Sequence, residues 1–316
     1  MKYKIYFHVG YPKTATSFLQ DYIFTQLKNV NYIPTSHIVE SLLKIIVQDE
    51  FNFNYETIRE DIQKKLIPNK SNIISFESLC GEFRFKNINQ KLIADRLCKL
   101  FPESYIIFTI RNQYDLIESL YKQEIHQGGT KKFTEFINYK NGKLLPSYSP
   151  IDGRINLEMI NYVPIINYYA DIFGSSHIKI ILFEIIKAKG ISSFIKEIVS
   201  FLGTNEPIII PHKITNESFQ SHQIKIARFL NRLFRKDKYI ENGLIPEINI
   251  PILGKLNTSL VRKLLQSPLS FKILGHKPIT NQIIKTQVKE YYKNTNKDLD
   301  KKYNLSLNTL YKNYYF

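Results

Sequence analysis

Residues 8–19 read His8-Val9-Gly10-Tyr11-Pro12-Lys13-Thr14-Ala15-Thr16-Ser17-Phe18-Leu19, and this stretch decides the fold. The apolar run Ile5-Tyr6-Phe7 before it predicts a strand. A Gly-Tyr-Pro turn, a lysine and three hydroxyl residues follow, and they predict a tight turn into a helix over about residues 14–27. Backbone N–H groups, a cation and hydroxyls then surround one point, which suits an oxyanion such as phosphate or sulfate.

Further apolar runs predict strands at residues 72–76, 105–110 and 177–183, each separated from the next by helical sequence. Alternation of this kind predicts an α/β fold with a central parallel sheet flanked by helices. The expected helices lie near residues 36–48, 55–66, 89–101, 113–126, 157–173, 191–202, 220–235, 256–265 and 282–294, and a long loop is expected over 140–154. We expect one domain, with an α/β core over 1–211 and a basic, mainly helical part over 212–316.

The net charge of +16 is unevenly distributed along the chain. Residues 212–316 hold 19 Lys and Arg against 7 Asp and Glu, whereas the first 211 residues hold 25 against 21. Such a basic part fits nucleic acid, an anionic membrane face or a polyanionic small molecule, and it equally fits a solvated surface without a specific partner.

The chain has two cysteines, Cys80 and Cys98, which form neither a disulfide framework nor a metal motif, and we expect free thiols in a reducing compartment. No cluster has the spacing of metal ligands. No window approaches the roughly 20 apolar residues of a membrane span, and the N-terminal residues lead straight into the first strand. We therefore expect a soluble, cytoplasmic protein.

The loop departs from the phosphate loop of nucleotide triphosphatases, G-x-x-x-x-G-K-[ST], because no glycine precedes Lys13. Residues 10–20, Gly-Tyr-Pro-Lys-Thr-Ala-Thr-Ser-Phe-Leu-Gln, instead resemble the 5′-phosphosulfate loop of the sulfotransferases, including bacterial members. These enzymes use 3′-phosphoadenosine 5′-phosphosulfate (PAPS). The family usually has glycine where Ala15 stands.

A second resemblance begins at Arg111, at the end of the strand over 105–110. An arginine there, with Ser119 eight residues later, is similar to the 3′-phosphate motif of the same family, although Gln113 replaces the usual proline. Independently of the resemblance, an arginine at a strand end can bind a phosphate through bidentate hydrogen bonds from its guanidinium group. Weaker matches are the strand ending at Glu184, which we interpret as structural, and Thr215-Asn216-Glu217-Ser218.

The resemblance implies a P-loop-like sulfotransferase fold and transfer of a sulfuryl group from PAPS, with PAP (adenosine 3′,5′-bisphosphate) as product and no metal. Lys13 would stabilise charge on the bridging oxygen, and Gly10, Tyr11, Pro12 and Ala15 would form the turn. Thr14, Thr16 and Ser17 would hold the 5′-phosphate, and Arg111 and Ser119 the 3′-phosphate. Phe18 stands where family members place an aromatic ring against adenine, and a core position is an equal alternative.

An acceptor hydroxyl needs a general base. Glu77 follows the strand over 72–76, so it reaches the same sheet edge as Gly10 and Arg111, where ligands of open α/β sheets bind. It ranks first, before His37 and His126. His8 lies within the first strand, and we interpret it as structural or loop-positioning.

The analogy with bacterial members favours a carbohydrate or glycolipid acceptor, with peripheral contact of the basic part with an anionic membrane as a further expectation and no nucleic-acid partner. Two alternatives stay open. A P-loop-type kinase would require Mg²⁺ and ATP, and a non-enzymatic nucleic-acid-binding protein would be indifferent to Lys13 and bind with steep salt dependence.

Overall fold

The computed structural model describes residues 3–81, 89–145, 154–211, 220–233, 248–250, 254–256, 279 and 281–316. It divides into two compact units, Met1–Gln113 with Asn156–Ile214 and Lys289–Phe316, and Tyr114–Ile155 with Thr215–Val288. The motif Thr215-Asn216-Glu217-Ser218 lies outside the described residues.

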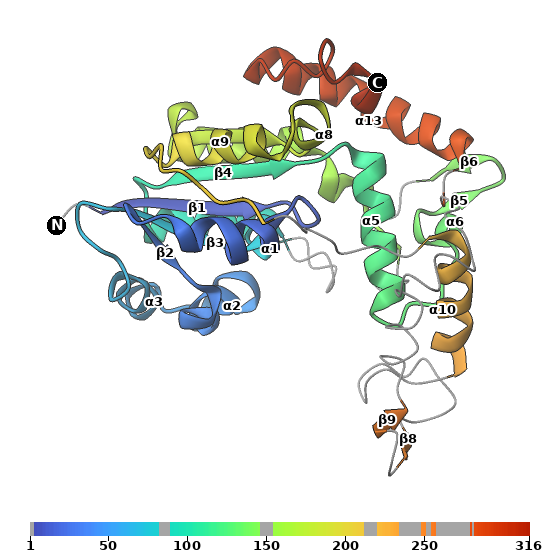
Figure 1. Ribbon diagram of the computed structural model, residues 1–316, viewed down its shortest axis with the longest axis horizontal. Helices are drawn as coiled ribbons and strands as arrows, with labels where there is room; N and C mark the ends of the chain where they lie inside the picture. The colour runs from blue at the N-terminus through green and yellow to red at the C-terminus, as the bar shows by residue number, and fades with distance from the viewer. Residues whose placement is uncertain are drawn as a thin grey trace. The chain divides into compact units, whose positions relative to one another are not determined.

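The first unit is built on a five-stranded parallel sheet with the strand order β2-β3-β1-β4-β7. Its strands are β1 (Lys4–Gly10), β2 (Val30–Ile33), β3 (Ser71–Ser75), β4 (Tyr105–Ile110) and β7 (Ile178–Leu182). This sheet, with helices on both faces (Figure 1), confirms the predicted α/β fold. The chain leaves β1 toward β2 and β3 on one side and later places β4 on the other side, so the strand order reverses at β1. Ligands of open α/β sheets bind beyond the strand ends at such a point.

The helices of this unit cover both faces of the sheet through apolar side chains. The cluster that contains Tyr6, Ile73 and Ile107 also contains residues of the first helical segment and of the helix that follows β7. On the opposite face the ring of Phe108 meets that of Tyr169 edge-on at 5.1 Å. The helices are α1 (Thr16–Phe18), α2 (Val39–Val47), α3 (Tyr55–Gln63), α4 (Gln90–Leu100), α7 (Tyr162–Phe173), α8 (Ile185–Lys189), α9 (Ile191–Phe201) and α14 (Lys312–Tyr315).

Two expectations about elements were wrong, and a third falls almost entirely outside the described residues. The helix expected over 14–27 is α1 followed by a π-helix (Leu19–Ile23) and a 3₁₀ turn (Phe24–Gln26). Strand β2 was not expected, because its sequence Val-Asn-Tyr-Ile is short and has one polar residue, as suits a strand with only one neighbour. The helix expected over 256–265 lies outside the described residues except for Leu256, the last residue of β9 (Gly254–Leu256), which pairs with β8 (Ile248–Ile250).

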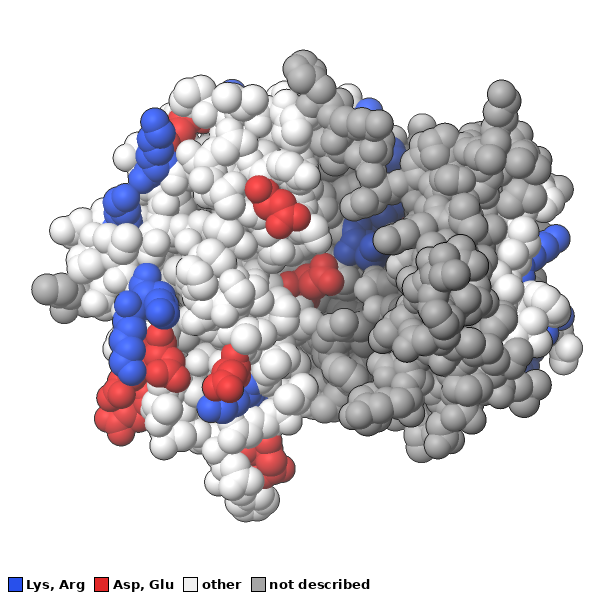
Figure 2. All heavy atoms as spheres, turned by 60° about the horizontal axis from the view of Figure 1, so that its bottom comes forward, with Lys and Arg blue, Asp and Glu red and all other residues white. Residues whose placement is uncertain are grey.

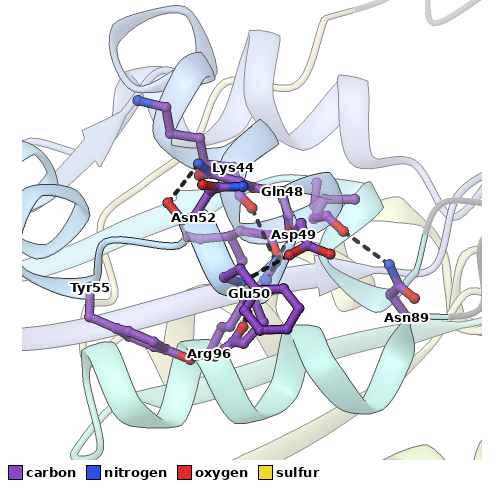
Figure 3. Close-up of polar contacts among 11 residues, drawn as sticks. Lys44, Gln48, Asp49, Glu50, Asn52, Tyr55, Asn89 and Arg96 are labelled. Atoms are coloured by element: carbon purple, nitrogen blue, oxygen red, sulfur yellow. Dashed lines mark hydrogen bonds and ion pairs between the residues drawn. The ribbon is translucent and has the colours of Figure 1, made fainter.

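Arg96 on α4 joins α2 to α4 through all five of its N–H donors (Figure 3). Nη1 and Nη2 donate to the carbonyls of Lys44, Ile45 and Gln48 at 3.2, 2.9 and 2.6 Å, and these carbonyls lie at the end of α2. Nε and Nη2 donate to Glu50 Oε2 at 3.0 and 2.8 Å. Arg96 is 0% exposed, and because every donor is satisfied it is a structural residue.

The second unit contains most of α5 (Gln113–His126), together with α6 (Phe133–Phe136), α10 (Ser221–Leu233) and the hairpins β5 (Tyr139–Lys140)–β6 (Lys143–Leu144) and β8–β9. Asn231 on α10 donates to the carbonyls of Ile125 and Gly129, both at 2.8 Å, which joins α10 to the end of α5. The loop expected over 140–154 contains part of the first hairpin, and residues 146–153 lie outside the described residues.

The long helix α13 (Gln282–Tyr303) crosses the boundary between the units, and its part from Lys289 onward packs within the first unit. There Tyr292 donates to the carbonyl of Leu157 at 2.7 Å, and Asn296 forms a buried reciprocal amide pair with Gln113 at 2.7 and 3.2 Å. Gln113, which stands where the sulfotransferase pattern has proline, is therefore a core contact of α13. No helix in the described ranges is long and apolar enough to cross a membrane.

Candidate functional site

The loop after β1 has a backbone that an ordinary turn into a helix does not show. A register shift between His8 and Gly10 interrupts the pairing of β1 with β4, and the N–H of Tyr11 then donates to the carbonyl of Thr109 at 2.7 Å. Lys13 and Ala15 both have positive φ, 64° and 70°. Alternation of left- and right-handed residues turns successive N–H groups toward one side, which makes an anion-binding concavity.

Helical backbone begins at Thr16, directly after the left-handed Ala15. A side chain in the left-handed region costs roughly 1–2 kcal/mol, and glycine avoids this cost. The conformation of Ala15 thus explains why a glycine suits its position.

Gly10 brings this loop against Glu77, the first residue of the 3₁₀ turn after β3. Gly10 has φ 86°, and a Cβ added there would lie 3.1 Å from Glu77 Cα and 3.2 Å from Glu77 Cβ. Any side chain at this position would be strained by the positive φ and would have to displace Glu77 by a few tenths of an ångström. The structure therefore brings Glu77 beside the loop, at the carboxyl end of the sheet.

Arg111 approaches the same loop from the end of β4. Its Nη1 donates to the carbonyl of Lys13 at 3.3 Å, and its guanidinium stacks on the ring of Phe183 at 4.8 Å. The hydroxyl of Tyr162 donates to the Arg111 carbonyl at 2.5 Å. Sequence reasoning missed Phe183 and Tyr162, because a ring under a guanidinium has no local sequence signal.

Arg111 differs from Arg96 in that its donors are not all used. Arg111 Nε and Thr16 Oγ1 are buried, and neither has a hydrogen-bond partner among the residues that the structure describes. A buried donor without a partner costs about 1–3 kcal/mol. Two such donors beside one loop are the kind of exception that a ligand oxygen would resolve.

The charged groups of Glu77 and Arg111 both influence the pKa of Lys13. Desolvation lowers the pKa of its ammonium group below the usual value, the Glu77 carboxylate raises it, and the Arg111 guanidinium lowers it further. Because Lys13 is exposed, solvent screens these influences on its pKa. The chain thus gathers two cations and a carboxylate at this edge of the sheet.

The remaining loop residues divide between the core and solvent. Tyr11, Pro12 and Thr14 are buried, and Ser17 is exposed. The Thr14 hydroxyl donates to the Tyr11 carbonyl at 2.5 Å and contacts Thr109 Oγ1 at 2.6 Å, so it serves the loop itself. Phe18 belongs to the apolar cluster under the sheet, which favours the core alternative over an adenine contact.

The two alternative bases lie in different units. His37 is exposed in a 3₁₀ turn (Thr35–His37) that follows β2. The neighbouring Thr35 donates to the Ser75 carbonyl at 3.2 Å, which holds this turn near the end of β3. His126 is exposed at the end of α5 in the second unit, where Ser119 is partly buried on the same helix.

A buried carboxylate holds the backbone directly after Arg111. Glu184, 1% exposed, accepts from the backbone N–H and the side-chain amide of Asn112 at 2.9 and 3.0 Å. The hydroxyl of Tyr315 donates to its other oxygen at 2.8 Å. Glu184 is therefore structural, as expected, and Tyr315 is a supporting residue that sequence reasoning missed.

Gly10→Ala is expected to destabilise the fold by about 2–4 kcal/mol, since it adds left-handed strain to a clash with the backbone of Glu77. Gly174→Ala is the matched control, because Gly174 also has positive φ, 93°, but no atom lies within 4 Å of the added Cβ. Urea unfolding should show a loss of about 1 kcal/mol for the control. Equal losses in the two variants would mean that the approach of Glu77 to the loop is not close.

The described charged residues on one face of the molecule carry both signs, interspersed (Figure 2). Much of the basic part over 212–316 lies outside the described residues. Among the described residues, no group of three or more His, Cys, Asp or Glu side chains could hold a metal ion.

Comparison with known proteins gives similarities to solved structures. No family model matches the chain, and no curated protein matches it. The chain is similar to a solved structure described as a sulfotransferase from Alicyclobacillus acidocaldarius, with a TM-score of 0.47 and 17% sequence identity. The similarity covers 69% of this chain and 87% of the other.

Proposed function

We propose that the chain is a sulfotransferase that moves a sulfuryl group from PAPS to an acceptor hydroxyl. One observation carries the proposal: the left-handed turn at Lys13 and Ala15 lies against Arg111, and buried donors at Arg111 Nε and Thr16 Oγ1 have no partner in the described chain. Unused donors and two cations at a strand-order reversal suit a polyanionic ligand. The loop residues 10–20 match the 5′-phosphosulfate loop, and the absence of a glycine before Lys13 distinguishes them from a nucleotide triphosphatase loop.

The loop would bind the 5′ side of the donor. Its N–H groups, with the hydroxyls of Thr16 and Ser17, would hold the 5′-phosphate, while Gly10, Tyr11 and Pro12 shape the turn. Thr14 would contribute through its backbone, since its hydroxyl is used within the loop. Lys13 would neutralise charge that develops on the bridging oxygen as the S–O bond breaks.

The 3′-phosphate would be bound by Arg111, whose Nε offers a free direction for a bidentate contact. The structural support at this strand end is the ring of Phe183 beneath the guanidinium and the hydrogen bond from Tyr162 to its carbonyl. Ser119 is proposed for the same phosphate on the sequence motif alone.

The acceptor would be activated by Glu77. The acceptor oxygen attacks sulfur, its proton passes to the Glu77 carboxylate, and PAP departs with the bridging oxygen. Contact with Gly10 and the electrostatic link to Lys13 place Glu77 beside the loop. His37 and His126 are alternatives. A carbohydrate or glycolipid hydroxyl is the proposed acceptor, with membrane contact through the basic part.

Thermal unfolding with PAP tests the assignment. A ligand that binds only the native state raises its free energy of unfolding by RT ln(1 + [L]/Kd), about 2.7 kcal/mol at one hundred times Kd. PAP should raise the Tm of the wild type, Arg111→Ala should abolish most of this rise, and Lys13→Ala should reduce it.

ATP with Mg²⁺ serves as the comparison ligand. A larger shift with ATP–Mg²⁺ than with PAP would favour a kinase. Absence of a shift with PAP, or an equal shift in Arg111→Ala, would contradict the sulfotransferase proposal.

A further inference from the structure

Three polar side chains lie side by side inside the sheet, directly beneath the loop. His8, Ser75 and Thr109 come from β1, β3 and β4, and each is 0% exposed. In each strand the polar residue interrupts an otherwise apolar end. Buried polar groups are costly unless they are hydrogen-bonded, so their partners define what they do.

In the hydrogen bonds between the sheet and the loop, the donor and the acceptor can be assigned in only one consistent way. A carbonyl can only accept, so Thr14 Oγ1 donates its one proton to the Tyr11 carbonyl at 2.5 Å. Thr109 must then donate to Thr14 across 2.6 Å. Having no second proton, Thr109 accepts from His8, and Nε2 of the imidazole therefore carries a proton at this 3.1 Å contact.

The contacts of His8 Nδ1 agree with a proton on Nε2. Full burial lowers the pKa of His8 to about 3, so the ring is neutral near pH 7 and Nδ1 is an acceptor. Ser75 Oγ donates to Nδ1 at 2.7 Å and accepts from Gln20 Nε2 at 3.2 Å. One chain of hydrogen bonds thus runs from Gln20 through the sheet to the Tyr11 carbonyl.

We propose that His8, as the neutral Nε2–H tautomer, is a positioning residue for the loop over residues 11–15. The chain of hydrogen bonds ends on the hydroxyl of Thr14 and the carbonyl of Tyr11, which bracket the turn. It therefore holds Lys13 and Ala15, on either side of Thr14, in their left-handed conformations. His8 has no exposed surface, so it acts through Thr109 and Thr14 and does not touch the ligand.

The relevance of His8 to catalysis rests on the proposed function, but its tautomer and its effect on the loop do not. Nitrogen-15 NMR of the histidine rings reads the tautomer in the wild type, with His8 assigned among the seven histidines by the signal lost in His8→Gln. We expect a protonated Nε2, a bare Nδ1 and no titration between pH 5 and 8. An Nδ1–H tautomer or a titration in that range would overturn the proposal.

Thr109→Val and Thr109→Ser form the matched pair for the effect on the loop. Valine keeps the shape but removes the hydroxyl, whereas serine keeps the hydroxyl that joins His8 to Thr14. In Thr109→Val the backbone carbon-13 shifts of Ala15 should move away from left-handed values, and the affinity for PAP should fall about tenfold. Thr109→Ser should keep the Ala15 shifts and the PAP affinity of the wild type, which a purely structural role at this site does not predict.

Two results separate failure of this proposal from failure of the proposed function. Unchanged Ala15 shifts in folded Thr109→Val would overturn the positioning role, even if PAP binds. If wild-type protein does not bind PAP, the sulfotransferase assignment fails, while the ring nitrogen and Ala15 signals still decide the role of His8 without any ligand.

Discussion

Lys13→Ala is expected to lower the turnover of PAPS about 100- to 1000-fold, the usual effect of removing one preorganised group that stabilises transition-state charge. Lys13 lies on the left-handed turn of the loop, and its ammonium is close enough to Glu77 and Arg111 for both to influence its pKa. No other lysine is proposed to reach the bridging oxygen. The affinity for PAP should fall less than the turnover, because the loop N–H groups and Arg111 remain.

The measurement is release of PAP from PAPS in the presence of a panel of carbohydrate acceptors. Lys64→Ala is the control, since Lys64 is an exposed lysine of the first unit that pairs with Asp61 at the surface. Glu77→Gln, measured alongside, should lose turnover but keep PAP binding if Glu77 is the base. Retention of more than a tenth of the wild-type turnover in Lys13→Ala would remove Lys13 from the proposed chemistry.

Arg96→Ala is expected to lower the free energy of unfolding by about 3–5 kcal/mol, a large part of the stability of an ordinary domain. The substitution leaves the carbonyls of Ile45 and Gln48 without this donor, whereas that of Lys44 keeps the backbone N–H of Gln48 at 3.1 Å. It also opens a cavity beside Phe53, whose ring lies 4.0 Å from the guanidinium. Each buried acceptor left without a partner costs about 1–3 kcal/mol. Glu50 limits the loss, because its side chain is half exposed and can be solvated again.

Arg59→Ala is the matched control for urea unfolding. Arg59 also binds carbonyls at the end of a helix, those of Lys99 and Leu100 at 2.9 and 3.0 Å, but it is only partly buried. We expect its loss to stay near 1 kcal/mol. Similar losses for the two variants would mean that burial of the Arg96 guanidinium does not decide its contribution.

Much of the sheet could be predicted because four of its strands contain apolar residues in succession. Strands β1 and β4 are buried along almost their whole length and have long apolar runs, as strands covered on both faces do, while β3 and β7 have the shorter runs Ile73-Ile74 and Ile180-Ile181-Leu182. Strand β2 was missed because a short strand at the edge of a sheet carries a weak signal. The first helix was predicted too long because helical spacing does not distinguish an α-helix from the π and 3₁₀ turns found there.

The neighbourhood of Gly10, Glu77 and Arg111 could also be predicted, since the carboxyl ends of parallel strands share one edge. The conformation of the loop could not. The sequence shows an alanine at position 15, and only the structure shows that its backbone is in the left-handed conformation. The packing contact of Gln113 could not be predicted either, because its partner Asn296 lies 183 residues away in the sequence.

The α/β class, the position of the loop after β1 and the strand ends near it follow from the sequence, because apolar periodicity and turn residues are local properties. Which hydroxyls of the loop are already hydrogen-bonded depends on the tertiary structure. Thr14 was expected to be a ligand donor, but its hydroxyl is bound by Thr109 and Tyr11, while the hydroxyl of Thr16 has no partner among the residues that the structure describes. That difference depends on contacts among strands far apart in the chain, and a hydrogen-bond donor can serve the loop or the ligand only according to what lies next to it in space.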